Sequence, residues 1–232
     1  KVGQMIQYNG SWDLTGPASE TGNKQKEDRL KKGLVGSMLN VLSVEATETA
    51  QKLNIENSRI KIPIIFGYDV IHGYKTIFPV PLAETASWDM EAAEESARIA
   101  ALESVAEGVN WTFSPMIDVS RDARWGRIME GSGEDPYLTS QVAVAKVNGY
   151  QGDDLADPTT IAATAKHFAG YGFAEGGKDY NTVNIGKNEL HNVILPPFKA
   201  AADAGAATFM NAFNTIDGIP ATGSKSLQRE LL

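Results

Sequence analysis

Residues Val109 to Pro136 read VNWTFSPMIDVSRDARWGRIMEGSGEDP, and this stretch indicates the fold. The apolar run Val109–Val119 predicts a buried strand. Asp135 followed by Pro136 is a typical helix start, with a capping side chain and a proline at the first helical position. The polar segment between them therefore leaves the carboxyl end of a strand and enters a helix. In α/β proteins, ligands bind at that end of the strands.

The polar segment, residues 121–134, is called the arginine loop below and allows two interpretations. Its arginines are Arg121, Arg124 and Arg127, and the acids near them are Asp118, Asp122 and Glu130. These charges could simply pair with one another at the surface. Alternatively, an arginine held beside Trp125 presents a rigid fork of donors to hydroxyls or anions. The tryptophan and the glycines among the charges favour the second interpretation for the loop as a whole.

Apolar runs and helix-type patterns alternate along the chain. The expected strands are Leu34–Leu39, Pro63–Ile71, Val109–Val119, Ile161–Phe168 and Ala206–Phe213. The expected helices are Val44–Asn57, Met90–Glu107 with Asp89 as its cap, Pro136–Asn148 and Asn188–Ala204, and a further helix begins at Lys225. Lys1–Tyr8 is expected to be a short helix and Gly10–Lys32 a polar loop. Such alternation predicts a parallel sheet with helices outside it.

Polar residues gather just after four of the expected strands, at residues 69, 118–127, 166–167 and 211–214. A (β/α)8 or TIM-like barrel collects strand ends of this kind on one face. A doubly wound sheet is the alternative, but the chain has no GxGxxG after its first strand and no phosphate loop. Successive strands lie roughly 45 residues apart, so eight units would exceed the ~250 residues of a typical barrel. The chain is therefore predicted to hold about five βα units of an incomplete barrel.

The composition argues against several functional classes. A net charge of −8 over 232 residues disfavours nucleic acid and anionic membrane surfaces as partners. No apolar run approaches the ~18 residues that a membrane span needs. The chain has no cysteine, and its three histidines are not spaced as in a zinc-binding helix, so no metal is expected. No cofactor is expected either, and the sequence does not indicate an oligomeric state.

Four side chains after the strands could form a polar site. They are Asp69, Arg127, Lys166 and His167. A carboxylate, a guanidinium and an ammonium together match the donors and acceptors of a ring of vicinal hydroxyls. The alternative is a structural ion-pair network at the mouth of the barrel. The chain lacks a GxSxG nucleophile elbow, so the sequence offers no serine hydrolase site.

Five stretches, in this order along the chain, resemble one enzyme family. They are FGYDVIHG (66–73), FPVPLA (78–83), NWTFSPMIDVSRDARWGRIMEGSGEDP (110–136), AKHFAGYG (165–172) and FMNAFNTIDGIPAT (209–222). Their combination resembles the N-terminal barrel of glycoside hydrolase family 3, the family of β-glucosidases and exo-β-glucanases. The stretch EGGKDYNTV (175–183) is similar to the bacterial periplasmic β-glucosidase branch, which implies a periplasmic or secreted protein.

The resemblance implies roles for individual residues. Asp69 should accept hydrogen bonds from two hydroxyls of the sugar in the −1 subsite, and Arg127, Lys166 and His167 should hold the remaining hydroxyls. Met210 should lie near the sugar. Phe213 stands where many members carry a tyrosine close to the nucleophile, so a hydrogen bond made by that hydroxyl would be absent here. Glu134 and Asp135 match a family motif that braces the loop and caps the helix.

The family's two catalytic carboxyl groups are not expected in this chain. Members are retaining enzymes whose nucleophile is an aspartate in a segment such as SDW or SDH, and no such segment occurs here. The resemblance places the nucleophile beyond Leu232 and the acid/base glutamate later still. Residues 1–232 should thus be the N-terminal part of the barrel domain, without the rest of the barrel and the second domain. We expect this part alone to be inactive.

The resemblance implies hydrolysis of terminal non-reducing β-D-glucosyl residues from β-glucosides or β-glucans by double displacement. A β-xylosidase or a β-N-acetylglucosaminidase of the same family is the enzymatic alternative. The second usually continues KHFPGHG with an Asp-x-His loop, whereas this chain has KHFAGYG. A non-catalytic carbohydrate-binding fragment is the alternative from another class. The linkage and the aglycone preference are not encoded in these motifs.

Overall fold

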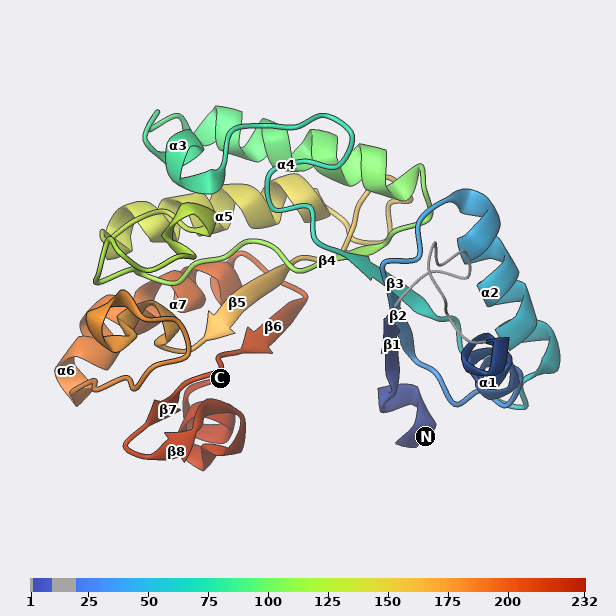
Figure 1. The fold of residues 1–232 in the computed structure, drawn as a ribbon. Coiled ribbons are helices and arrows are strands. Elements are labelled where there is room, and N and C mark those ends of the chain that lie inside the picture. The colour runs from blue at the N-terminus through green and yellow to red at the C-terminus, as the bar shows by residue number, and fades with distance from the viewer. Residues whose placement is uncertain (1, 10–19) are drawn as a thin grey trace. The chain divides into compact units, whose positions relative to one another are not determined.

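The computed structural model describes residues 2–9 and 20–232, with side chains from residue 24 onward in the second range. The described chain divides into two compact units. The first unit comprises residues 1–69 and 102–112, and the second comprises residues 70–101 and 113–232. Each unit is described by itself below (Figure 1).

The first unit is built on a parallel sheet of four strands in the order β1-β2-β3-β4. The strands are β1 (Gln7–Asn9), β2 (Ser37–Leu39), β3 (Ile65–Tyr68) and β4 (Trp111–Thr112). A 3₁₀-helical turn (Val2–Met5) precedes β1, and helices α1 (Glu20–Lys31) and α2 (Val44–Asn57) connect the first three strands. The register pairs Met38 with both Tyr8 and Phe66, so side chains of three strands share one face.

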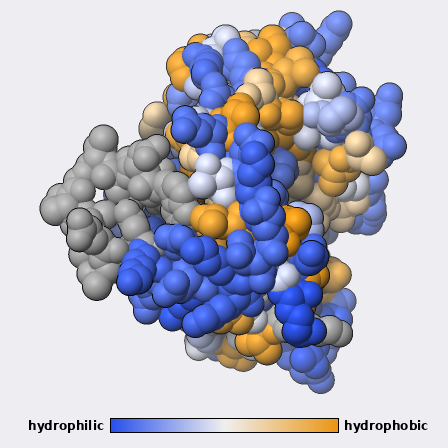
Figure 2. Space-filling view, turned by 90° about the vertical axis from the view of Figure 1, so that its right-hand side faces the viewer, coloured by the Kyte–Doolittle hydropathy of each residue, from blue (hydrophilic) through white to orange (hydrophobic). Residues whose placement is uncertain are grey.

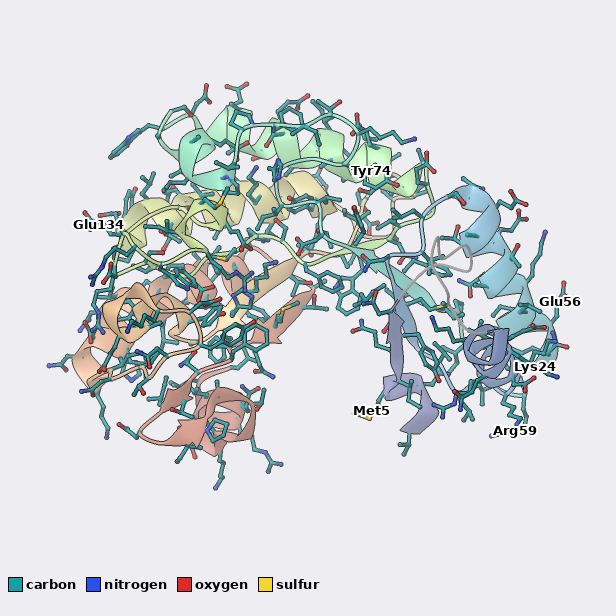
Figure 3. The ribbon with its side chains drawn as sticks, in the orientation of Figure 1. Met5, Lys24, Glu56, Arg59, Tyr74 and Glu134 are labelled. Carbon is teal, nitrogen blue, oxygen red and sulfur yellow. The ribbon has the colours of Figure 1, made fainter. Side chains whose placement is uncertain are left out.

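Apolar residues of α1, α2 and the sheet form the core of the first unit. The core residues are Leu30, Val35, Met38, Val41, Ala46, Ala50, Ile64 and Phe66. Ser43 caps α2 by accepting a hydrogen bond from the amide of Ala46. The outward side of these helices is polar: Lys24, Glu56 and Arg59 point away from the unit (Figure 3). Hydrophilic residues also predominate on the face drawn in Figure 2, where apolar residues occur in separate patches.

The second unit pairs β5 (Thr164–Phe168) in parallel with β6 (Thr208–Asn211). Its helices are α3 (Pro81–Thr85), α4 (Met90–Val105, up to residue 101 in this unit), α5 (Pro136–Gln151), α6 (Lys187–Glu189) and α7 (Leu195–Asp203). A short antiparallel hairpin, β7 (Thr215–Ile216) and β8 (Ile219–Pro220), follows β6. Helices α5 and α7 pack side by side next to β5 (Figure 1).

Capping side chains and one close helix–helix contact determine where the helices of the second unit begin and how they pack. Asp135 caps α5 by accepting a hydrogen bond from the amide of Leu138 at 2.6 Å, and Asp89 does the same for Ala92 at 2.9 Å. Gly149 lets α5 approach α4 closely, because a Cβ at this position would lie 2.3 Å from the carbonyl oxygen of Glu94. Helix positions are thus fixed both by local capping and by a glycine contact.

The predicted α/β class with parallel strands is confirmed. Within the described residues the strands form separate sheets and do not close a barrel. Helices α2, α4 and α5 begin where the sequence predicted, at Val44, Met90 and Pro136. The strands are shorter than their apolar runs; the run Val109–Val119 contributes only β4 and a single bridge at Met116.

Three local predictions were wrong. Residues 20–31 form helix α1 rather than a loop, because its almost wholly polar sequence offers no apolar periodicity; residues 10–19 of that predicted loop lie outside the described chain. Residues 7–9 form strand β1 rather than part of a helix. The helix predicted over Asn188–Ala204 was expected to be interrupted at Pro196 and Pro197. Its irregular part is instead a π-helical turn at Leu190–Ile194, and the two prolines lie in the first turn of α7, where no amide donor is needed.

Candidate functional site

Strand β5 places two polar side chains in the interior of the second unit. All five residues of β5 are buried, and Lys166 and His167 are only 2% and 1% exposed. The backbone around Lys166 is held on both sides. Its amide donates to the carbonyl of Pro115 at 3.1 Å, its carbonyl accepts from Ile117 at 2.8 Å, and Met210 of β6 is its register partner.

Asp118 fixes the imidazole of His167. One oxygen of this buried carboxylate, Oδ2, accepts hydrogen bonds from the backbone amide of His167 at 3.0 Å and from its Nδ1 at 2.8 Å. This places a proton on Nδ1, because an imidazole nitrogen must carry hydrogen to donate to a carboxylate. Nε2 then lies 3.4 Å from Nη1 of Arg127. The carboxylate therefore sets both the tautomer and the orientation of the ring.

Glu130 holds the guanidinium of Arg127 in a two-pronged ion pair. Arg127 donates from Nε to Oε1 at 2.6 Å and from Nη2 to Oε2 at 2.7 Å. Burial tends to raise the pKa of Glu130, but the hydrogen bonds and charge of Arg127 outweigh it, with smaller effects from Lys166 and His167, so the pKa is lowered. Burial likewise tends to lower the pKa of Arg127, and the Glu130 carboxylate reverses that effect. The pair leaves Nη1 directed at His167.

Aromatic rings surround Arg127 and His167. The Tyr171 ring lies 5.0 Å from that of His167 and 5.1 Å from that of Trp125, edge to face in both cases. The guanidinium carbon of Arg127 lies 5.5 Å from the centroid of the same tyrosine. The Phe213 ring lies 5.8 Å from His167 and is 57% exposed. Side chains held among rings in this way keep one orientation, because the packed rings restrict their rotamers.

Five of the predicted site residues lie in the second unit, and the sixth, Asp69, lies in the first. Arg127 and His167 are in direct contact, Lys166 and Met210 face each other in register, and Phe213 contacts His167. Asp69 follows β3 at the end of the first unit and is exposed. Its convergence with the others stays a prediction.

Two of the loop arginines pair with acids of the loop, as the first interpretation predicted. Arg124 pairs with Asp122, and Arg127 pairs with Glu130 while also reaching His167. The presentation of an arginine to hydroxyls or anions stays a prediction. Asp118, expected among the arginines, instead binds His167. Asp135 caps α5, as the family motif implied. Glu134 is exposed and points outward (Figure 3).

Sequence reasoning missed three residues that shape the site. They are Asp118 as the anchor of His167, Glu130 as the anchor of Arg127, and Tyr171 as the ring between them. The signal for Asp118 was its position at the end of an apolar run, since a carboxylate there lies near the end of a neighbouring parallel strand. No group of three or more metal-binding side chains occurs within residues 2–9 and 24–232. The described helices include none long and apolar enough to cross a membrane.

Comparisons with known proteins identify the family. The Glycosyl hydrolase family 3 N terminal domain matches residues 1–232. The periplasmic β-glucosidase of Salmonella typhimurium is 42% identical over 205 residues, which are 88% of this chain and 27% of that protein. A putative β-xylosidase of Formosa agariphila is 34% identical over 244 residues, covering 98% of this chain and 32% of that protein.

Solved structures agree with these matches. A variant β-glucosidase from Listeria innocua in complex with laminaribiose superposes with a TM-score of 0.92 at 42% identity, covering 99% of this chain and 33% of that chain. The glucose complex of the β-glucosidase from the same organism gives a TM-score of 0.88 at 42% identity, with the same coverage. This chain spans about a third of the length of such relatives. It belongs to glycosyl hydrolase family 3 and matches that family's N-terminal domain.

Proposed function

We propose that this chain supplies the −1 sugar-binding half of an exo-acting β-glucosidase, which removes terminal non-reducing β-D-glucosyl residues from β-glucosides or β-glucans with retention. Arg127 and Lys166 would donate to the sugar hydroxyls, His167 would hold a further hydroxyl, and Asp69 would accept from two of them. Met210 and Phe213 would contact the sugar ring.

The observation that carries this proposal is the buried pair Lys166–His167 beside the Arg127 guanidinium. A lysine side chain as buried as Lys166 is rare in proteins. Beside it, the Asp118 carboxylate holds His167 and the Glu130 carboxylate holds Arg127. Such a site is preorganised, so binding a polyol costs little side-chain entropy.

The same contacts support placing the nucleophile and the acid/base outside residues 1–232. A retaining mechanism needs two carboxyl groups about 5–5.5 Å apart, one on each side of the scissile bond. Asp118 is occupied by His167 and Glu130 by Arg127, so both carboxylates act as anchors. Lys1–Leu232 alone should therefore not hydrolyse glycosides.

The relatives support a glucoside as substrate and name one alternative. Listeria innocua β-glucosidase structures contain laminaribiose or glucose, and the Salmonella typhimurium relative is a β-glucosidase named as periplasmic. By this similarity we infer a periplasmic or secreted enzyme. β-Xyloside hydrolysis is the second candidate, because the putative β-xylosidase of Formosa agariphila matches 98% of this chain.

The test uses the complete reading frame that contains this chain, assayed with aryl β-D-glucoside and aryl β-D-xyloside. We expect higher kcat/KM on the glucoside and β-glucose as the first product in NMR. Lys166→Met should lower kcat/KM by about 100-fold, since hydrogen bonds from a charged donor contribute about 1.5–3 kcal/mol each. The matched control is Lys199→Met, at an exposed side chain of α7, which should leave kcat/KM unchanged.

Each other outcome has a defined meaning. Higher kcat/KM on the xyloside would replace the glucosidase by the xylosidase. Equal activity of Lys166→Met and Lys199→Met would refute the assigned site. Sugar binding without turnover of either substrate by the complete protein would indicate a non-catalytic carbohydrate-binding protein. Turnover by Lys1–Leu232 alone at the rate of the complete protein would contradict the placement of the catalytic carboxyl groups.

A further inference from the structure

The glycine-rich segment Ala174–Val183 lies against the arginine loop in the second unit. Gly177 has a φ of +65°, a left-handed backbone conformation that favours glycine. A Cβ at this position would lie 2.9 Å from the backbone nitrogen of Trp125. The segment is also bonded to itself, since Glu175 donates to Thr182 at 3.0 Å and Asn181 to Lys178 at 3.0 Å. The backbone of Ala174–Val183 is therefore in close contact with the backbone of the arginine loop, about 50 residues earlier in the sequence. Only a residue without a side chain allows so close an approach.

Asp179 makes a specific bond across this contact. Its Oδ1 accepts a hydrogen bond from the indole Nε1 of Trp125 at 2.9 Å. Trp125 is 1% exposed, so its indole donor needs a partner from the protein. Burial tends to raise the pKa of Asp179, but the Trp125 indole, the Tyr171 hydroxyl and the charge of Arg127 outweigh it and lower the pKa. The carboxylate is thus held in its charged form.

Asp179 also acts on Tyr171, whose ring contacts both Arg127 and His167. The Tyr171 hydroxyl is buried and has no partner of full hydrogen-bond geometry among the described residues, yet the charges of Asp179 and Arg127 both reach it. Burial raises the pKa of this hydroxyl, and Asp179 raises it further. Tyr171 therefore stays neutral, with its ring edge to face with both Trp125 and His167.

These contacts form a continuous chain from Asp179 to the sugar-binding side chains. Asp179 binds the Trp125 indole, Trp125 packs on Tyr171, and Tyr171 contacts the guanidinium of Arg127 and the imidazole of His167. We propose that Asp179 is a positioning residue for β-glucoside hydrolysis, which sets Arg127 and His167 through Trp125 and Tyr171. The proposal rests on the sugar-binding role proposed above.

The test measures, in the complete enzyme, kcat and KM on an aryl β-glucoside and the inhibition constant of glucose. Asp179→Ala should raise the glucose inhibition constant and lower kcat/KM about tenfold. The reason is that removing a residue that orients binding side chains typically costs at least that factor in affinity or activity. Asp179→Asn keeps an acceptor for the indole and should lose less than Asp179→Ala. Asp203→Asn, on the exposed end of α7, is the matched control and should equal the wild type.

A double variant separates positioning from general destabilisation. If Asp179 acts through Arg127, adding Asp179→Ala to Arg127→Lys should lower kcat/KM far less than tenfold, because coupled residues are not additive. Full additivity, or an Asp179→Ala enzyme with wild-type kinetics, would overturn the proposal. If Arg127→Lys itself leaves glucoside kinetics unchanged, the proposed function fails, and the positioning role fails with it. A loss in Asp179→Ala that Asp179→Asn does not recover even in part would also count against it.

Discussion

Removing one partner of the buried ion pair between Lys146 and Glu84 should destabilise the protein far more than removing one partner of an exposed pair of the same geometry. The Nζ of Lys146, on α5, lies 2.5 Å from Oε2 of Glu84 on α3 and 2.7 Å from the hydroxyl of Ser96 on α4. The two charged side chains are 4% and 9% exposed. Burial lowers the pKa of Lys146 although Glu84 opposes the shift, so the ammonium has lost more hydration than its partner restores.

The expected magnitude follows from what Lys146→Met leaves behind. The Glu84 carboxylate would remain buried, and among the described residues it would keep only the Ser96 hydroxyl as a side-chain donor, at 2.5 Å. Breaking a buried pair by removing one partner costs about 3–5 kcal/mol, because the remaining charge is unpaired. In a unit of this size that corresponds to a fall of about 10 °C in the melting temperature.

The exposed pair on α7 provides the control. Lys199 and Asp203 also approach to 2.5 Å, but their side chains are 75% and 65% exposed. Exposed pairs contribute about 0–1 kcal/mol, so Lys199→Met should shift the melting temperature by no more than about 2 °C. The double variant Lys146→Met/Glu84→Gln should recover more than half of the loss, because it removes the unpaired charge.

Scanning calorimetry of the complete protein and the three variants measures these shifts. Since unfolding of a multidomain protein need not be two-state, the transition that contains this unit is followed by hydrogen exchange of α3, α4 and α5. Equal shifts for Lys146→Met and Lys199→Met would refute the reasoning. So would a double variant no more stable than Lys146→Met.

Three further outcomes are expected. Asp118→Asn should lower kcat/KM by about 10²-fold and also lower the melting temperature, since the amide weakens the bond to His167 and leaves a buried amide donor where the second carboxylate oxygen has no partner among the described residues; wild-type kinetics would contradict this. In the complete enzyme, Asp69→Asn should cost roughly hundreds-fold in kcat/KM and Glu45→Gln on α2 about nothing, and equal kinetics would refute the assignment of Asp69. The pKa of Glu130 is lowered from 4.5, so the wild type should be more stable than Glu130→Gln above about pH 4.5, and this difference should shrink as the pH falls through the lowered pKa. If acid titrations show a difference in stability that does not depend on pH, the ion pair is not its source.

The site illustrates how far sequence reasoning reaches. Lys166 and His167 could be picked out because they lie near the carboxyl end of an apolar run, and Arg127 because it follows another. Ligands bind at the carboxyl ends of parallel strands. Their anchors could not be identified in this way. Asp118 is 49 residues from His167 in sequence, and the bond between them depends on which strands are neighbours and in what register. Asp179 is 54 residues from Trp125, and the bond between them needs the close passage of Gly177.

The sequence by itself determined the α/β class, the starts of α2, α4 and α5, and the family, because capping, apolar periodicity and short motifs act over a few neighbouring residues. It did not indicate α1, whose polar residues have no periodic apolar face. Only the tertiary structure decided that Lys146 is a buried cation and that Asp118, Glu130 and Asp179 hold the site. The physical reason is that burial and long-range pairing depend on how distant segments pack, and no local pattern carries that information.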